Sequence, residues 1–152
     1  KLYIMLEQIP TNISLGLNLG GMTAFLFFLA NFVVIFRLIH KVITPSVKWE
    51  WLDNLQNRWH YIHYFGNLGA VILTIVHAVL MSGYAHPLHW VLIALLVWMA
   101  IAGLIMRFTK VSVDIKKKIR IFHAKWYMFV AVFILLIASH LLSLTNFPYA
   151  IG

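Results

Sequence analysis

The chain has 152 residues, of which 62% are hydrophobic and only 11% are charged. A soluble domain of this length must turn much of its surface to water, so this composition excludes an ordinary soluble globule and favours a membrane protein. The absence of cysteine excludes disulfides, thiolate-bound iron–sulfur clusters and covalent haem attachment through a Cys-x-x-Cys-His motif. Histidine, which occurs eight times, is then the most abundant side chain able to ligate a transition metal.

Four stretches are long and apolar enough to cross a bilayer, which takes about 20 mostly apolar residues. In hydrocarbon only helices and closed barrels satisfy their backbone hydrogen bonds, and these runs are too long and continuous for barrel strands. We therefore expect an all-α membrane protein, a four-transmembrane-helix bundle that forms a single transmembrane domain over residues 1–152. The expected helices lie at residues 13–36, 61–81, 88–106 and 121–144.

Lysine and arginine gather around two of the three connections between these spans, and residues 82–87, which connect the second and third spans, contain neither. The positive-inside rule then predicts that both basic connections are cytoplasmic and that both termini lie outside. This orientation accounts for the net charge of +8. We expect a multi-pass protein of the cell (inner) membrane, surrounded by lipid, with no nucleic-acid partner.

Small and polar residues in the first two spans predict close helix contacts. Gly16 and Gly20 form a Gly-x-x-x-Gly pattern that allows two helices to approach closely. Asn18 and Asn31 lie in the same span, and we expect both to make interhelical hydrogen bonds.

Four histidines are candidate metal ligands, because a histidine inside a span is costly unless it is paired or coordinated. His63 and His77 lie in the second span, and His123 and His140 lie in the fourth. These two spans run in the same direction, so His63 can face His123 near the inner surface and His77 can face His140 near the outer surface. Each pair is predicted to hold one haem iron from both sides.

The spacing of these histidines tests this prediction. The 14 residues from His63 to His77 rise about 21 Å and fall about 40° short of whole turns, so both rings share one helix face. The 17 residues from His123 to His140 drift by about 100°, so the fourth span must tilt, curve or contain a local irregularity. His60 lies 17 residues before His77 and is the alternative to His63 as the inner ligand.

Residues around the inner pair are typical of a haem site. Gly66 and Gly69 are predicted to let a macrocycle approach the backbone. The cations at the level where the propionates of an inner haem would emerge are candidates to pair with them. These cations are Arg58, Arg120 and Lys125.

Two stretches of sequence that contain or lead to the candidate ligands resemble a known family. The run Arg58–Gly69, RWHYIHYFGNLG, which leads to His77, is similar to the histidine helix of ferric-reductase-like transmembrane cytochromes. This group includes the membrane part of NADPH oxidases and the haem subunit of methionine sulfoxide reductase systems. The run Arg120–His123 resembles its partner helix, and Gly103–Arg107 resembles a span end of bacterial dihaem cytochromes b.

The resemblance implies a cytochrome b with two haem b groups, whose axial ligands are the four residues His63, His77, His123 and His140. The family usually has six helices, whereas this chain has four expected spans. It also has no Gly-rich dinucleotide fingerprint, so we expect an electron-transport subunit of a larger oxidoreductase complex that exchanges electrons with other subunits or a quinone. Whether the chain is itself an enzyme stays open.

Two other functions remain open at this point. A cofactor-free membrane anchor or quinone-site subunit would bind no haem and would tolerate leucine at His77 and His140. A histidine-based proton or metal-ion transporter would be expected to carry carboxylates inside its spans. All four Asp and Glu residues lie outside the predicted spans, which makes the transporter the weakest of the three hypotheses.

Overall fold

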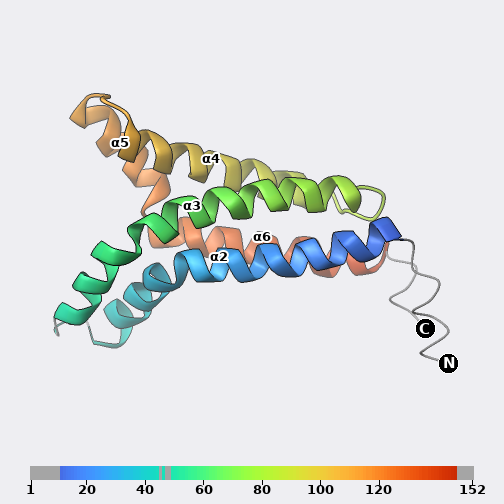
Figure 1. Cartoon of the computed structure of the whole chain (residues 1–152), viewed down its shortest axis with the longest axis horizontal. Helices are drawn as coiled ribbons and strands as arrows, with labels where there is room; N and C mark the ends of the chain where they lie inside the picture. The colour runs from blue at the N-terminus through green and yellow to red at the C-terminus, as the bar shows by residue number, and fades with distance from the viewer. Residues whose placement is uncertain (1–10, 45, 47–48, 147–152) are drawn as a thin grey trace.

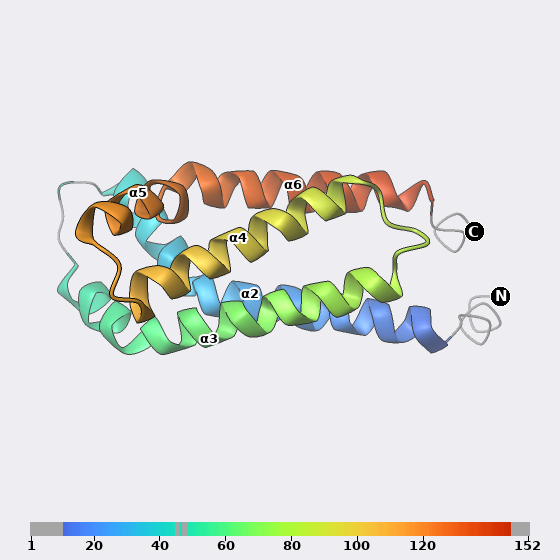
Figure 2. The ribbon, with the colours of Figure 1, turned by 90° about the horizontal axis from the view of Figure 1, so that it is seen from above.

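The computed structural model describes residues 11–44, 46 and 49–146, and within them the chain forms helices and no strand. Four of the five helices are long and apolar enough to cross a membrane, which confirms the predicted all-α bundle and indicates a multi-pass membrane protein. The long helices run alongside one another (Figures 1 and 2). The five helices are α2 (Thr11–Ile43), α3 (Glu50–Leu80), α4 (Leu88–Phe108), α5 (Val113–His123) and α6 (Trp126–Leu144).

The described ends of the chain lie together. The first turn of α2 and the last turn of α6 are at one end of the bundle, opposite the end at which α2 finishes and α3 begins (Figure 1). The predicted domain over 1–152 also includes residues 1–10, 45, 47–48 and 147–152, which lie outside the described part of the chain.

The first two helices are longer than the predicted spans 13–36 and 61–81. α2 continues to Ile43 and α3 begins at Glu50, so both extend beyond the apolar runs into polar sequence. The prediction counted apolar residues alone. A helix can continue into polar sequence, because its backbone hydrogen bonds are internal in water as well as in lipid. Glu50 and Asp53 in the first turn of α3 favour this early start, because negative charge stabilises a helix N-terminus. Asp53 also forms an ion pair with Arg37 of α2.

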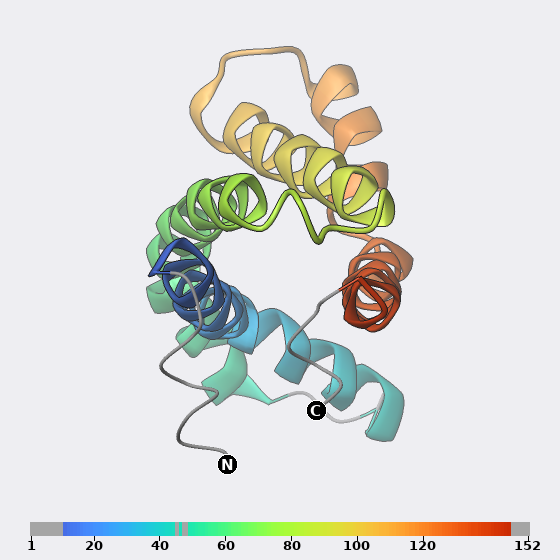
Figure 3. The same cartoon turned by 90° about the vertical axis from the view of Figure 1, so that its right-hand side faces the viewer.

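The prediction of one continuous helix over 121–144 is wrong. α5 ends at His123 and α6 begins at Trp126, with Lys125 in an extended conformation between them. α5 runs steeply across the end of the bundle, whereas α6 lies along it (Figures 1 and 3). The basic sequence of α5 is costly to bury in hydrocarbon, which explains why the chain turns before it enters the span. The break is also the local irregularity that the 17-residue spacing required.

α2 and α3 form the most extensive helix pair. A Cβ atom on Gly66 would lie 2.8 Å from Cβ of Ala30, so glycine is needed for this close approach. Asn31 Nδ2 donates a hydrogen bond of 2.7 Å to Asn67 Oδ1 across the pair, as predicted for Asn31. The prediction for Asn18 is not met, since that residue is exposed and makes no such bond among the described residues.

α6 stands apart from this pair and packs chiefly on α4, which in turn contacts α3. Aromatic contacts connect α6 to α2: the rings of Phe27 and Phe129 are 6.3 Å apart, and those of Phe28 and Phe133 are 5.6 Å apart. Viewed from the end, α2 and α3 lie on one side and α6 on the other (Figure 3). The second and fourth spans thus face each other without close packing along their length.

Candidate functional site

A cavity of about 1280 Å³ lies between these two sides of the bundle. It exceeds the roughly 300–1,000 Å³ of most small-molecule pockets. Residues from all five helices line it, and it is continuous from one predicted histidine pair to the other. The histidines on its lining are the four predicted ligands His63, His77, His123 and His140, together with His60 and His89.

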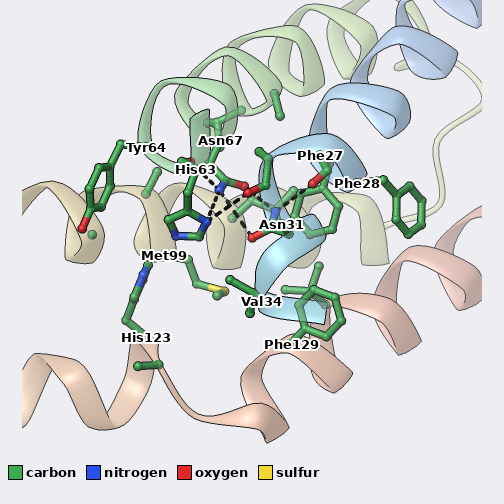
Figure 4. A pocket seen from close by; sticks show the side chains of 18 of the residues that line it. Phe27, Phe28, Asn31, Val34, His63, Tyr64, Asn67, Met99, His123 and Phe129 are labelled. Atoms are coloured by element: carbon green, nitrogen blue, oxygen red, sulfur yellow. Dashed lines mark hydrogen bonds between the residues drawn. The ribbon is translucent and has the colours of Figure 1, made fainter. Parts of the chain in front are cut away.

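The first pair lies where α5 meets the bundle. His63 projects from α3, and His123, the last residue of α5, approaches it from the opposite side (Figure 4). Their ring centroids are 6.3 Å apart and the ring planes make an angle of 76°. The break after His123 turns this ring toward α3, so the predicted facing of His63 and His123 is present in the structure.

The second pair lies towards the other end of the same cavity. His77 of α3 and His140 of α6 also have ring centroids 6.3 Å apart, but their ring planes differ by only 8°. The structure therefore brings together the four predicted residues in the two predicted pairs, with equal separations and different ring orientations.

Both separations suit two imidazoles that share one metal ion. A ligating nitrogen lies about 2 Å from its metal, and the ring centre lies roughly 1 Å behind that nitrogen, so the centroids are about 6 Å apart. Among the described residues, no group of three or more histidine or acidic side chains could hold a bare ion. Two protein ligands per centre suit an iron whose other four ligands come from a macrocycle.

Main-chain carbonyls select the ring nitrogen that faces the cavity. Nδ1 of His77 lies 2.7 Å from the oxygen of Gly16, and Nδ1 of His140 lies 2.8 Å from that of Leu136. A carbonyl only accepts, so Nδ1 carries the proton in both rings and Nε2 keeps the lone pair that a metal requires. Ligating histidines commonly donate their other N–H in this way.

The ring of His63 has two candidate partners for Nδ1. The oxygen of Ala30 lies 3.3 Å away and accepts from a protonated Nδ1. The amide nitrogen of Asn67 lies 3.2 Å away and would donate to the opposite tautomer. The ring is thus oriented from both α2 and α3, and the Ala30 contact leaves its Nε2 free to ligate.

Several polar atoms on the cavity lining lack partners. Oγ1 of Thr23, Nε2 of His60 and Nδ1 of His123 are buried without a hydrogen bond among the described residues. The backbone oxygen of Met99 lies near the His123 ring and raises its pKa slightly, but it does not make a hydrogen bond of good geometry with Nδ1. Burial, followed by the nearby His63 ring, lowers the pKa of His123 below its ordinary value, which keeps the imidazole in the neutral form that binds metals. Buried groups left unpaired in this way point to a ligand.

Cations border the end of the cavity near the first pair. Two of the three predicted cations, Arg120 and Lys125, line it, whereas Arg58 is exposed and does not contribute to the lining. The lining includes three further cations that the sequence did not single out: Lys41, Lys117 and Arg37, the last of which is already paired with Asp53. This end of the cavity therefore suits an anionic group.

The predicted role of Gly66 and Gly69 is wrong. A Cβ on Gly66 would meet Ala30, and one on Gly69 would come within 3.1 Å of Leu26, so both glycines face α2. Other glycines lie against the histidines. A Cβ on Gly20 would be 2.8 Å from Cε1 of His77, and one on Gly103 would be 3.1 Å from Cε1 of His123.

Two further histidines reach the cavity: His60, the alternative inner ligand, and His89, which the sequence did not single out. His60 lines it but has no ring contact with His123 among the described residues. His89 is buried, and its ring lies 4.8 Å from that of His140. Nothing in the spacing distinguishes His89 in the sequence, since its proximity depends on how α4 packs on α6.

Comparison of the chain with protein-family models, with curated proteins and with solved structures finds no match. The assignment of a function therefore depends on the cavity and its histidine pairs.

Proposed function

We propose that the chain is a membrane b-type cytochrome that holds two haem b groups and passes electrons across the bilayer. His63 and His123 would ligate the inner haem, and His77 and His140 the outer one. The observation that carries this proposal is the equal 6.3 Å separation of the two ring pairs along one cavity.

When bound, haem supplies reversible one-electron chemistry. The protein would bind each iron through two imidazoles, leaving no axial position for oxygen, which favours electron transfer over oxygen binding. Carbonyls of Gly16 and Leu136 would keep the outer ligands in the required tautomer. The apolar lining disfavours the more positively charged oxidised state, and the cations near the inner pair add to this effect, so both raise the reduction potential.

The two sites would divide the path across the membrane. Fourteen residues of α3 separate His63 from His77, a rise of about 21 Å. The excess of Lys and Arg around α5 supports a cytoplasmic position for the inner site and an external position for both chain termini. As part of this proposal we place the chain in the cell (inner) membrane.

We further propose that the chain acts as a subunit of a larger redox complex, with electrons entering or leaving through other subunits or a quinone. At most 17% of the most apolar window of any span is buried within the chain, so much apolar surface remains for lipid and partner helices.

The test is the haem content of the natively isolated protein. A pyridine haemochrome assay and a reduced-minus-oxidised spectrum should give two b haems per chain. Substituting His123 or His140 with Ala should remove one haem each, from the inner and outer site respectively. His63→Ala should also remove one, whereas the matched variant His60→Ala should keep both.

Other outcomes would revise the proposal. If His60→Ala loses a haem and His63→Ala does not, the inner ligand is His60. A folded, natively isolated protein without haem would overturn the proposal and favour the cofactor-free anchor.

A further inference from the structure

The short helix α5 is amphipathic and exposes its apolar face. Ile115, Ile119 and Phe122 are spaced at i, i+4 and i+7, which places them in one stripe along the helix. Ile115 is 47% exposed and Phe122 is 53% exposed, and no residue of α5 is buried. Within the described chain, therefore, no neighbouring helix covers this stripe fully.

Basic side chains accompany the stripe. α5 contains four cations and one carboxylate, Asp114, and none of the cations forms an ion pair within the described residues. At about 100° per residue, Lys116 and Lys118 fall on either side of the stripe. Neither lysine lines the cavity, in contrast to Lys117 on the other side of the helix.

The position of α5 identifies what this face meets. α5 connects the end of α4 to the start of α6, two helices apolar enough to span a membrane, and it crosses their direction steeply (Figures 1 and 3). It therefore lies at the level where the spans leave the hydrocarbon. Trp126, the first residue of α6, is 60% exposed at the same level, as is typical of a membrane interface.

We propose that α5 is an interfacial helix that binds acidic phospholipids. Its stripe of Ile115, Ile119 and Phe122 enters the boundary of the acyl chains, and Lys116 and Lys118 reach past the stripe to anionic headgroups. An acidic soluble protein would match the charge, but it would leave the stripe in water until it docked. Lipid satisfies both faces at once, since the flanking spans already place α5 in the headgroup layer.

This inference does not depend on haem. If the proposed function also holds, the lipid contact has a consequence for the inner site, because His123 is the last residue of α5. Lipids that hold α5 in the interface would then help to hold this ring towards His63.

The absence of cysteine allows a direct test. We would introduce a single cysteine at Ile115 or, as a control, at Val113, and label each with an environment-sensitive fluorophore. Val113 is also aliphatic and is 81% exposed, but it lies about 200° around the helix from Ile115. The full chain is placed in nanodiscs of phosphatidylcholine, with or without phosphatidylglycerol.

We expect the label at 115 to emit at shorter wavelength and to be quenched several-fold more strongly by nitroxide-bearing lipids than the label at 113. Equal, water-like emission at the two positions would overturn the proposal. A label at 115 that is shielded only in complexes isolated from native membranes, and not in nanodiscs, would also overturn it and would indicate a protein partner.

The lysines are tested on the labelled Ile115→Cys background. Phosphatidylglycerol should shift the emission of the parent, and Lys116→Gln with Lys118→Gln should abolish that shift. Arg58→Gln, which removes an exposed cation of α3, should leave it unchanged. A shift that survives the double substitution would refute the role of these lysines. Circular dichroism and elution volume verify that each variant is folded.

Discussion

At the scale of single residues, main-chain oxygens rather than carboxylates hold the cavity histidines. His77 and His140 each direct Nδ1 at a carbonyl, and the sequence has only four Asp and Glu residues in total. A carbonyl is a weaker acceptor than a carboxylate, so it makes the ring a less basic ligand for a metal than a carboxylate partner would. Neutral ligands leave the charge of an iron uncompensated, which favours its reduced state.

Glycine leaves the space that the His77 ring occupies. Replacing Gly20 with Ala would put a methyl group 2.8 Å from Cε1 and 3.0 Å from Nδ1 of His77. We expect this overpacking to cost about 1–3 kcal/mol and to displace the ring from the oxygen of Gly16. If the protein binds two haems as proposed, its haem content should fall from two per chain to one.

Gly21→Ala is the matched control, because nothing lies within 4 Å of its added Cβ. Alanine has the higher helix propensity, so this variant should be as stable as the parent or gain up to about 1 kcal/mol. Thermal unfolding and haem content measure both variants. Equal behaviour of the two would contradict the role given to Gly20.

The sequence identified the histidines more readily than their neighbours. Four ligand candidates followed from the cost of a histidine in hydrocarbon and from helix direction. The Gly-x-x-x-Gly pattern predicts only a helix contact for Gly20, and the prediction that Gly66 and Gly69 face a macrocycle is wrong because they face α2. A glycine pattern predicts that another group lies close to the helix. Which group it is depends on how each helix is rotated about its own axis.

At the scale of elements, the close pairing of α2 and α3 is the best-packed part of the bundle. Gly66 and Ala30 allow the two backbones to approach, and the Asn31–Asn67 hydrogen bond fixes their register. A bond of this kind between membrane helices contributes about 0.6 kcal/mol on average.

The glycine and the alanine at this contact can be exchanged between the two helices. Gly66→Ala should destabilise the protein by about 1–3 kcal/mol, because its methyl group would lie 2.8 Å from that of Ala30. Adding Ala30→Gly should recover most of the loss, since one methyl group then remains at the contact. Unfolding in mixed detergent micelles measures the double-mutant cycle, in which a coupling of about 0.5–3 kcal/mol is expected. Additive effects would argue against direct contact.

The break between α5 and α6 was only partly foreseeable. The 17-residue spacing required an irregularity, and the residues around it include neither proline nor glycine to mark its position. The turn follows from a conflict between a basic amphipathic segment and the apolar span after it. The periodicity of the sequence alone does not predict the residue at which the helix breaks.

At the scale of the whole molecule, the cavity lies between two unequal halves. α2 and α3 pack closely together, whereas α6 is attached through α4 and through phenylalanine contacts. The four-span bundle could be predicted from hydropathy, because lipid imposes length and composition on every span. The cavity between the halves could not be predicted from hydropathy, because it depends on which pairs of helices are not in close contact.

The two histidine pairs differ in one respect that spacing does not predict, which is the angle between their ring planes, 76° for His63 and His123 and 8° for His77 and His140. In a low-spin ferric ion, parallel imidazole planes separate the two iron d orbitals that interact with them, and perpendicular planes leave those orbitals nearly equal in energy. With the two proposed haems bound, the electron paramagnetic resonance spectrum of the oxidised protein should therefore contain two signals. The outer site should give an ordinary rhombic signal, and the inner site a strongly anisotropic one.

Each signal can be assigned with a ligand variant. His123→Ala should remove the anisotropic signal, and His140→Ala the rhombic one; identical signals from the two sites would contradict the ring geometry. Two centres with the same ligands and the same iron would then be magnetically distinct because one chain holds its imidazoles crossed at one site and aligned at the other.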